Sequence, residues 1–195
     1  HGAWQKECYF DGSCRIPFLV SWPARLPRDQ RRADLVCLTD LFAIATGAAG
    51  ESEVREGTDV LGVIAGDESP RESYAGYYGS PGTRDFKIMV RSEEWKYIYL
   101  ANGGREQLFN LEEDPCELRN RAADAPEKAR LRELAVAAVD RTNADRAQEA
   151  GELKQFAFEA RPLKRIYQMD GSREVKGFPQ RPEDVVFDTG NTGDA

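Results

Sequence analysis

The feature that most constrains the fold is a run of alternating side chains between residues 73 and 111. Within it, Phe86, Ile88 and Val90 occupy every second position, which places them together on one face of an extended strand. Residues 96–100 (KYIYL) are rich in β-forming side chains, and the Asn102-Gly103 pair that follows is a strong hairpin signal. We therefore predict three or four antiparallel strands, at about residues 73–78, 85–91, 95–101 and 106–111.

A helix with one apolar face follows the predicted sheet. Residues 112–115 (EEDP) break the strand pattern, Asp124 is a candidate helix cap, and Pro126 is tolerated in a first helical turn. Small and apolar side chains then recur at the spacing of one helical face, at Leu131, Leu134, Ala135, Ala138 and Val139. We predict that this helix, near residues 125–140, packs its apolar face across the sheet.

The first third of the chain combines an apolar run with a helical pattern. Residues 17–22 (PFLVSW) are bounded by prolines and predict a buried strand. Asp34 is placed to cap a helix that reaches about Ala45 and ends at the glycines beyond it. Residues 58–65 predict a second, short helix. One strand–helix unit is typical of an α/β layer but cannot complete one, so we expect the other strands of that sheet to lie outside this chain.

The predicted fold class is therefore α+β. It combines a strand–helix piece of a larger α/β sheet with a four-stranded antiparallel sheet packed on a C-terminal helix. We expect three parts: residues 1–66 as the end of an incomplete α/β domain, 67–159 as the sheet-and-helix subdomain, and 160–195 as an extended tail.

Charge, hydropathy and cysteine spacing exclude several classes of protein. The net charge of −7 argues against a nucleic-acid binder, which presents a basic face. No run of about 18 apolar residues occurs, so we predict no membrane span. The four cysteines match no zinc-site spacing; Cys8 and Cys14 could pair, but we interpret all four as reduced thiols or packing residues. His1 is the only histidine, so this chain alone cannot assemble a Ser-His-Asp triad or a multi-histidine metal site.

Residues 1–6 (HGAWQK) and 9–17 (YFDGSCRIP) resemble the sulfatase family of the alkaline phosphatase superfamily. That family commonly carries H-G-x-W-x-K, an aromatic–acidic pair, S-x-R-[VI]-P, an apolar strand and W-P. The stretch is most similar to the branch of arylsulfatases, choline sulfatases and phosphonate monoester hydrolases. Four further segments resemble the family in its own order, within roughly the first 140 residues: 38–42 (LTDLF), 95–98 (WKYI), 107–111 (QLFNL) and 113–120 (EDPCELRN).

The resemblance implies a sulfate-ester hydrolase whose catalytic centre is only partly present in this chain. In the family, a formylglycine made from the Cys or Ser of a C/S-x-P-x-R motif is the nucleophile. A divalent metal such as calcium is held mainly by Asp, Asn or His residues that lie upstream. None of the four cysteines is followed by the proline and arginine of that motif, and the first residue is not methionine. We therefore expect a C-terminal fragment, inactive alone, whose nucleophile and metal ligands belong to a missing N-terminal catalytic domain.

By resemblance, Lys6 is the lysine whose ammonium contacts a sulfate oxygen of the substrate. Cleavage of a sulfate ester builds negative charge on the non-bridging and leaving-group oxygens, which a positioned ammonium stabilises. A lysine acts as a point charge and requires no bidentate fit, so it suits a tetrahedral oxyanion. The alternative is an ordinary surface lysine. His1 belongs to the same stretch and either supports the site or is part of an unstructured terminus.

Two further groups of residues are candidates for supporting or binding roles. Asp11 and Arg15 could form an ion pair that fixes the loop carrying the lysine, a packing role that we favour over substrate contact. An aromatic cluster either lines a substrate pocket or belongs to the core: Tyr74, Tyr77 and Tyr78.

Two alternatives to a sulfatase fragment stay open at this point. The chain could belong to a phosphonate or phosphodiester hydrolase of the same superfamily. It could also be a non-catalytic interaction or structural module that kept the fold and lost the chemistry.

Overall fold

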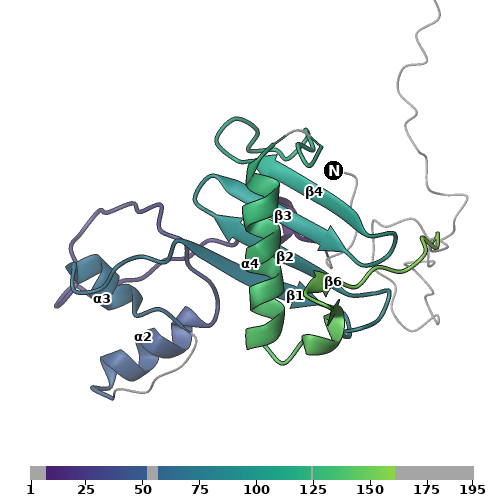
Figure 1. Ribbon diagram of the computed structural model, residues 1–195. Coiled ribbons are helices and arrows are strands. Elements are labelled where there is room, and N and C mark those ends of the chain that lie inside the picture. The colour runs from purple at the N-terminus through teal and green to yellow at the C-terminus, as the bar shows by residue number, and fades with distance from the viewer. Residues whose placement is uncertain (1–7, 52–56, 124, 161–195) are drawn as a thin grey trace, which may run out of the picture. The chain divides into compact units, whose positions relative to one another are not determined.

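A computed structural model describes residues 8–51, 57–123 and 125–160 (Figure 1). The chain divides into a unit of residues 1–158 and a unit of residues 159–195. Apart from residue 160, the predicted tail at 160–195 lies outside the described residues. In chain order the described elements are α1 (Asp11–Cys14), α2 (Asp40–Ala48), α3 (Val60–Ala65), β1 (Ser73–Tyr78), β2 (Lys87–Ser92), β3 (Trp95–Leu100), β4 (Arg105–Asn110), α4 (Glu127–Arg141), a 3-10 turn (Asp145–Ala147), β5 (Gln148–Glu149) and β6 (Glu152–Leu153).

Strands β1 to β4 form an antiparallel sheet in sequence order, β1-β2-β3-β4. The register places Tyr97 of β3 opposite Val90 of β2 and Leu108 of β4. Between β3 and β4 the chain turns through Gly103 and Gly104, which have φ of 85° and 58°, values that glycine adopts without steric cost. The predicted strands are confirmed to within two residues at every end, and the α+β class is confirmed with them.

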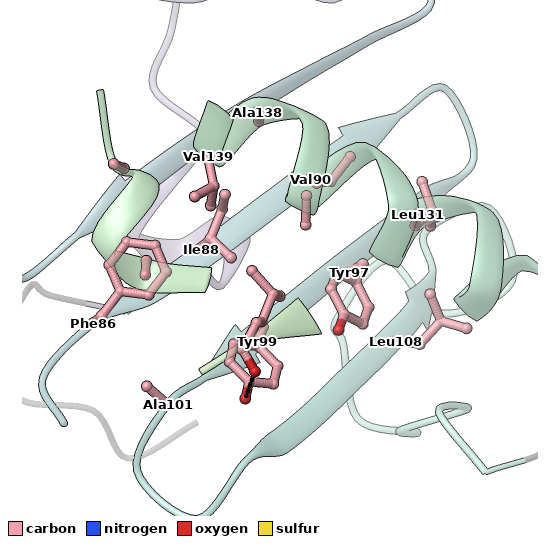
Figure 2. Close-up of a cluster of buried hydrophobic side chains, with 14 of the residues drawn as sticks. Phe86, Ile88, Val90, Tyr97, Tyr99, Ala101, Leu108, Leu131, Ala138 and Val139 are labelled. Carbon is pink, nitrogen blue, oxygen red and sulfur yellow. Dashed lines mark hydrogen bonds between the residues drawn. The ribbon is translucent and has the colours of Figure 1, made fainter. Parts of the chain in front are cut away.

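Helix α4 covers one face of this sheet, as predicted from its apolar stripe. Figure 2 shows Leu131 and Val139 of α4 above Val90, Tyr97 and other side chains of the sheet. Leu131, Ala135 and Val139 are fully buried, with 0% exposure each. The candidate cap Asp124 lies outside the described residues, and the helix begins at Glu127, directly after Pro126.

The opposite face of the sheet is covered by the segment that precedes and enters α1. Met89, Ile98 and Phe109 are buried there, with Tyr9 and Phe10 packed against them. The ring of Phe10 meets that of Phe109 edge-on, with centroids 5.8 Å apart. Since both faces of β3 are covered, this strand is buried almost throughout, which matters for the charged residue it carries.

Two predictions for the first third of the chain are wrong in the structure. Residues 17–22 form no strand, and Leu19 is 93% exposed. A strand requires a neighbour to satisfy its backbone groups, and the described residues place none beside this segment. The helix predicted from Asp34 begins at Asp40, while Asp34 pairs with Arg32 at 2.5 Å.

Other features of this region agree with prediction. The predicted short helix is present as α3, where the carboxylate of Asp59 accepts a hydrogen bond from Leu61 N at 3.0 Å. Helix α2 ends at Ala48, and Gly50 follows with a left-handed φ of 78°. Among the helices of the described residues, none has the length and hydrophobicity that crossing a bilayer requires.

We predict that Leu131→Ala destabilises the chain by about 2–5 kcal/mol, because it leaves a cavity between α4 and the sheet. Glu133→Ala, on the exposed side of the same helix, should change the unfolding free energy by less than about 0.5 kcal/mol. Urea unfolding of the two variants and the parent chain measures both. Equal stabilities would show that α4 does not pack on the sheet as described.

Candidate functional site

A buried lysine side chain lies at the centre of the candidate site. Lys96 of β3 is 1% exposed, and its Nζ donates hydrogen bonds to Asp11 Oδ1 and, at 2.7 Å, to Glu117 Oε1. The other carboxylate oxygen of Glu117 accepts a hydrogen bond from the Asp11 backbone N–H at 2.6 Å. We call these three residues the Lys96 cluster. Asp11 is therefore held through both its side chain and its backbone.

Three separate segments supply the Lys96 cluster. Lys96 lies on the face of β3 turned away from α4, because Tyr97 beside it packs into the core under α4. Asp11 is the first residue of α1, and Glu117 lies in the turn that follows β4. The cluster thus holds residues 8–16, which we call the amino-terminal loop, on the sheet. Along the chain, 85 positions separate Asp11 from Lys96.

The turn that carries Glu117 has an unusual backbone conformation. Glu117 has φ of 55°, a left-handed value that is uncommon for residues other than glycine. Asp114 fixes the turn: its carbonyl accepts from Glu117 N at 3.0 Å, and its carboxylate accepts from Arg119 N at 2.7 Å. Such a conformation costs free energy and persists where surrounding contacts determine it.

The charges of the Lys96 cluster depend on one another. The side chains of Lys96 and Glu117 are each 1% exposed, and that of Asp11 is 20% exposed. Removing one partner of a buried ion pair leaves an uncompensated charge, at a cost of about 3–5 kcal/mol, whereas the intact pair adds little net stability. The cluster therefore mainly fixes the geometry of its three segments.

Two arginines lie near Asp11 without replacing Lys96 as its main partner. Arg15 Nη1 is 3.9 Å from Asp11 Oδ2, but the Arg15 side chain is 73% exposed, so this predicted pair contributes little. Burial lowers the pKa of the Arg91 guanidinium, and the nearby Asp11 carboxylate acts in the opposite direction. Arg91 donates to the backbone carbonyl of Glu93 at 2.8 Å.

Sequence reasoning missed Lys96 and Glu117 as site residues. The sequence did contain a signal for Lys96, because this lysine begins a run of β-forming residues, and the strand they form is buried on both faces. A lysine in such a run requires a carboxylate partner. The identity of the carboxylate that pairs with Lys96 depends on tertiary contacts, so the periodicity of the sequence could not predict it.

The three candidate pocket tyrosines do not come together. Tyr74 packs on the face of the sheet that Phe10 covers, and burial raises the pKa of its hydroxyl. Tyr77 lies on the other face, with its ring 5.6 Å from that of Phe86. Tyr78 is 46% exposed and holds the Lys87 ammonium 4.9 Å from its ring centroid. The alternation of the strand separates Tyr77 from the other two.

Lys6 and His1 both lie outside the described residues. Among the described residues, no group of three or more His, Cys, Asp or Glu side chains could hold a metal ion. All four cysteines are free thiols in the structure, and the Cys14 thiol donates to the carbonyl of Cys8 at 3.4 Å. Burial raises the pKa of the Cys14 thiol.

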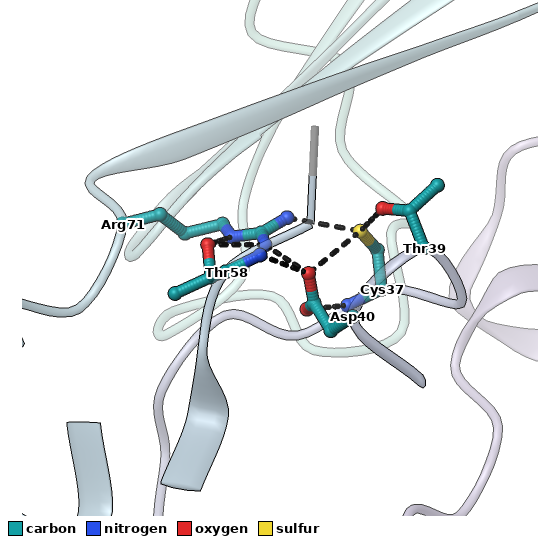
Figure 3. A network of polar contacts seen from close by, with 5 residues as sticks. All are labelled: Cys37, Thr39, Asp40, Thr58 and Arg71. Atoms are coloured by element: carbon teal, nitrogen blue, oxygen red, sulfur yellow. Dashed lines mark hydrogen bonds and ion pairs between the residues drawn. The ribbon is translucent and has the colours of Figure 1, made fainter. Parts of the chain in front are cut away.

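A second buried ion pair holds helices α2 and α3 to the segment before β1 (Figure 3). The carboxylate of Asp40 is fully buried and accepts hydrogen bonds from Arg71 and from the backbone N–H of Thr58, the latter at 2.8 Å. Arg71 also donates to the Thr58 hydroxyl at 3.1 Å and to the Cys37 sulfur at 2.9 Å. The network therefore joins the start of α2 to Thr58, just before α3, and to Arg71, just before β1.

The described residues thus form an α+β domain, a sheet meander backed by one helix with an amino-terminal loop held on its other face. The model of the family described as "N-sulphoglucosamine sulphohydrolase, C-terminal" matches residues 1–143. The chain belongs to this family.

Curated relatives are sulfatases and are much longer than this chain. A choline-sulfatase of Rhizobium meliloti (strain 1021) is 32% identical over 124 residues, which cover 62% of this chain and 24% of that protein. Arylsulfatase G of Rattus norvegicus is 29% identical over 164 residues, covering 67% of this chain and 30% of that protein. The chain thus spans about a quarter to a third of the length of these relatives.

Solved structures share the fold at lower identity. A Bacteroides fragilis protein superposes with a TM-score of 0.55 at 18% identity, covering 66% of this chain and 30% of that chain. A Bacteroides thetaiotaomicron protein from a genetic locus for glycosaminoglycan metabolism gives a TM-score of 0.51 at 24% identity, with the same coverage of 66% and 30%.

We predict that Arg71→Met destabilises the α2–α3 region, because it leaves the buried Asp40 carboxylate without its cation. The expected loss is about 3–5 kcal/mol. Hydrogen exchange of residues 40–48 and 60–65 measures it locally. Arg28→Met, at an exposed position, is the matched control and should leave exchange unchanged. Unchanged protection in Arg71→Met would contradict the described network.

Proposed function

We propose that the chain is the C-terminal part of a sulfatase that hydrolyses sulfate esters. A formylglycine nucleophile and a divalent metal such as calcium would be supplied by a preceding catalytic domain. The family match over residues 1–143 supports this, as does the fraction of each relative that the chain spans. The observation that carries the proposal is the attachment of Asp11, five positions after Lys6, to the sheet by a buried ion cluster.

Lys6 is the catalytic residue that we assign to this chain. Only four residues separate it from Asp11, so its Cα lies within about 18 Å of the Asp11 Cα, whatever the path between them. Its ammonium would donate to a sulfate oxygen and stabilise the charge that develops there and on the leaving oxygen. His1 would support the loop ahead of Lys6, whereas the exposed Arg15 contributes little to holding it.

The described residues do not fit a metal site, so the proposal assigns every metal ligand to the preceding domain. Bound there, the ion would polarise the sulfate oxygens. Of the three tyrosines, Tyr74 has the best support as a pocket residue, because it packs against the same buried cluster as Tyr9 and Phe10.

Exposed apolar side chains favour attachment to further protein over a free-standing module. Leu19 is 93% exposed, Leu38 64% and Leu41 48%. Large apolar side chains left this exposed are commonly covered by another protein surface. A preceding domain packed against this part of the chain would cover such side chains.

We predict that Lys6→Ala in the full-length enzyme lowers kcat on the order of 10²-fold or more, comparable to removing an oxyanion donor. Lys128→Ala is the control, since Lys128 lies on α4, at the opposite face of the sheet, and pairs with Glu106 at 3.3 Å. Turnover of an aryl sulfate measures both variants. Near-parental rates in Lys6→Ala would remove this lysine from the mechanism.

The upstream coding sequence separates the proposal from its alternatives. A sulfatase requires two motifs in the same reading frame before His1. By the family resemblance, these are C/S-x-P-x-R, which supplies the nucleophile, and S-D-[HN]-G, which supplies metal ligands. A start codon close to His1, with neither motif, would support the non-catalytic module. Hydrolysis of a phosphonate monoester in preference to an aryl sulfate would support the other branch of the superfamily.

A further inference from the structure

We propose that the Lys96 cluster fixes residues 8–16, the segment that follows Lys6 in the chain by two positions, so that Lys96, Asp11 and Glu117 act on catalysis through that lysine. This inference rests on the proposed function. It assigns a positioning role to residues of the sheet and of the turn after β4, none of which contacts the substrate in the proposal.

The amino-terminal loop cannot fix its own conformation. Helix α1 has only four residues, and an isolated helical turn is not stable in water. Its shape is therefore set by what it contacts on the sheet. Those contacts are of two kinds, the apolar packing of Tyr9 and Phe10 and the polar attachment of Asp11.

The two kinds of contact do different things. Apolar packing is not directional, so it holds the loop near the sheet without fixing its register. Asp11 is bound at two points: its N–H donates to Glu117 at 2.6 Å, and its carboxylate accepts from the buried Lys96 ammonium. Two attachments in different directions determine both the position and the orientation of this peptide.

The partners of Asp11 are themselves fixed. Lys96 lies in a strand whose four central residues are buried, and its ammonium is also bound to Glu117 at 2.7 Å. Glu117 itself has a left-handed backbone conformation, and residues in such conformations cluster at functional sites. The amino-terminal loop is therefore attached to buried residues of the domain. The attachment matters for catalysis because small displacements of catalytic groups can lower the rate about 10²-fold.

A purely structural cluster would behave differently from a positioning one. Structural damage lowers activity by unfolding the enzyme, whether or not Lys6 is present. A positioning defect acts only through Lys6, so it should disappear once that ammonium has been removed. A double-mutant cycle separates the two cases.

The test uses the full-length enzyme with 4-nitrophenyl sulfate as the probe. Asp11→Asn keeps the shape and the backbone N–H of Asp11 but removes its charge. We expect it to lower kcat by about 10-fold or more, with KM changed less than about threefold. In the Lys6→Ala background, the same substitution should lower kcat by less than about twofold.

Three further variants sharpen the result. Glu117→Gln should resemble Asp11→Asn, whereas Lys96→Met, which risks the fold, is interpreted only if its melting temperature stays near that of the parent. Arg15→Ala is the matched control, because it removes the exposed neighbour of Asp11 and should leave kcat within about twofold. Hydrogen exchange of residues 8–16 should rise in Asp11→Asn and stay unchanged in Arg15→Ala.

The outcomes are distinguishable. Equal losses from Asp11→Asn with and without Lys6, or no loss at all, would overturn the positioning role while leaving the proposed function intact. Unchanged exchange in residues 8–16 would also overturn it. A parent enzyme that does not cleave the aryl sulfate, or Lys6→Ala at parental rates, would overturn the proposed function and the positioning role together.

Discussion

The contact on which the structure most depends is the buried ammonium of Lys96 between two carboxylates. A lysine can be buried in a strand only if its charge is met there, and this one is met by a residue 85 positions before it and a residue 21 positions after it. Because Glu117 also accepts from the Asp11 backbone, the same contact fixes the start of α1. The amino-terminal loop, the sheet and the turn after β4 therefore form a single polar joint.

That joint explains why the four-stranded sheet is covered on both faces within one short domain. One face is closed by α4 through an apolar core that includes Tyr97 and Leu131. The other is closed by Tyr9 and Phe10, which are brought to it from residues near the start of the chain. Asp40 and Arg71 play a similar part further along, where a second buried pair holds α2 to the segment before β1. In both places an ion pair specifies a geometry that apolar packing alone would leave loose.

The candidate site was only partly predictable from the sequence. Lys6 and Asp11 came from a family resemblance, and the Asp11–Arg15 pair from spacing on one loop. Lys96 and Glu117 were not identified, because alternation assigns a strand lysine to a solvent-facing side unless both sides are known to be covered. Tyr74, Tyr77 and Tyr78 looked like one cluster by proximity in the chain, and the pleat of β1 divides them between two faces.

By itself, the sequence determined the elements whose pattern is local: four strands with period two, the Asn-Gly turn and the apolar stripe of α4. These depend on side chains a few positions apart, which one strand or helix brings together without help from the rest of the fold. Only the tertiary structure decided the fate of residues 17–22, since strand pairing requires a neighbour that local pattern cannot supply. It also decided which carboxylates meet Lys96, because buried charges select their partners across the whole chain rather than along it.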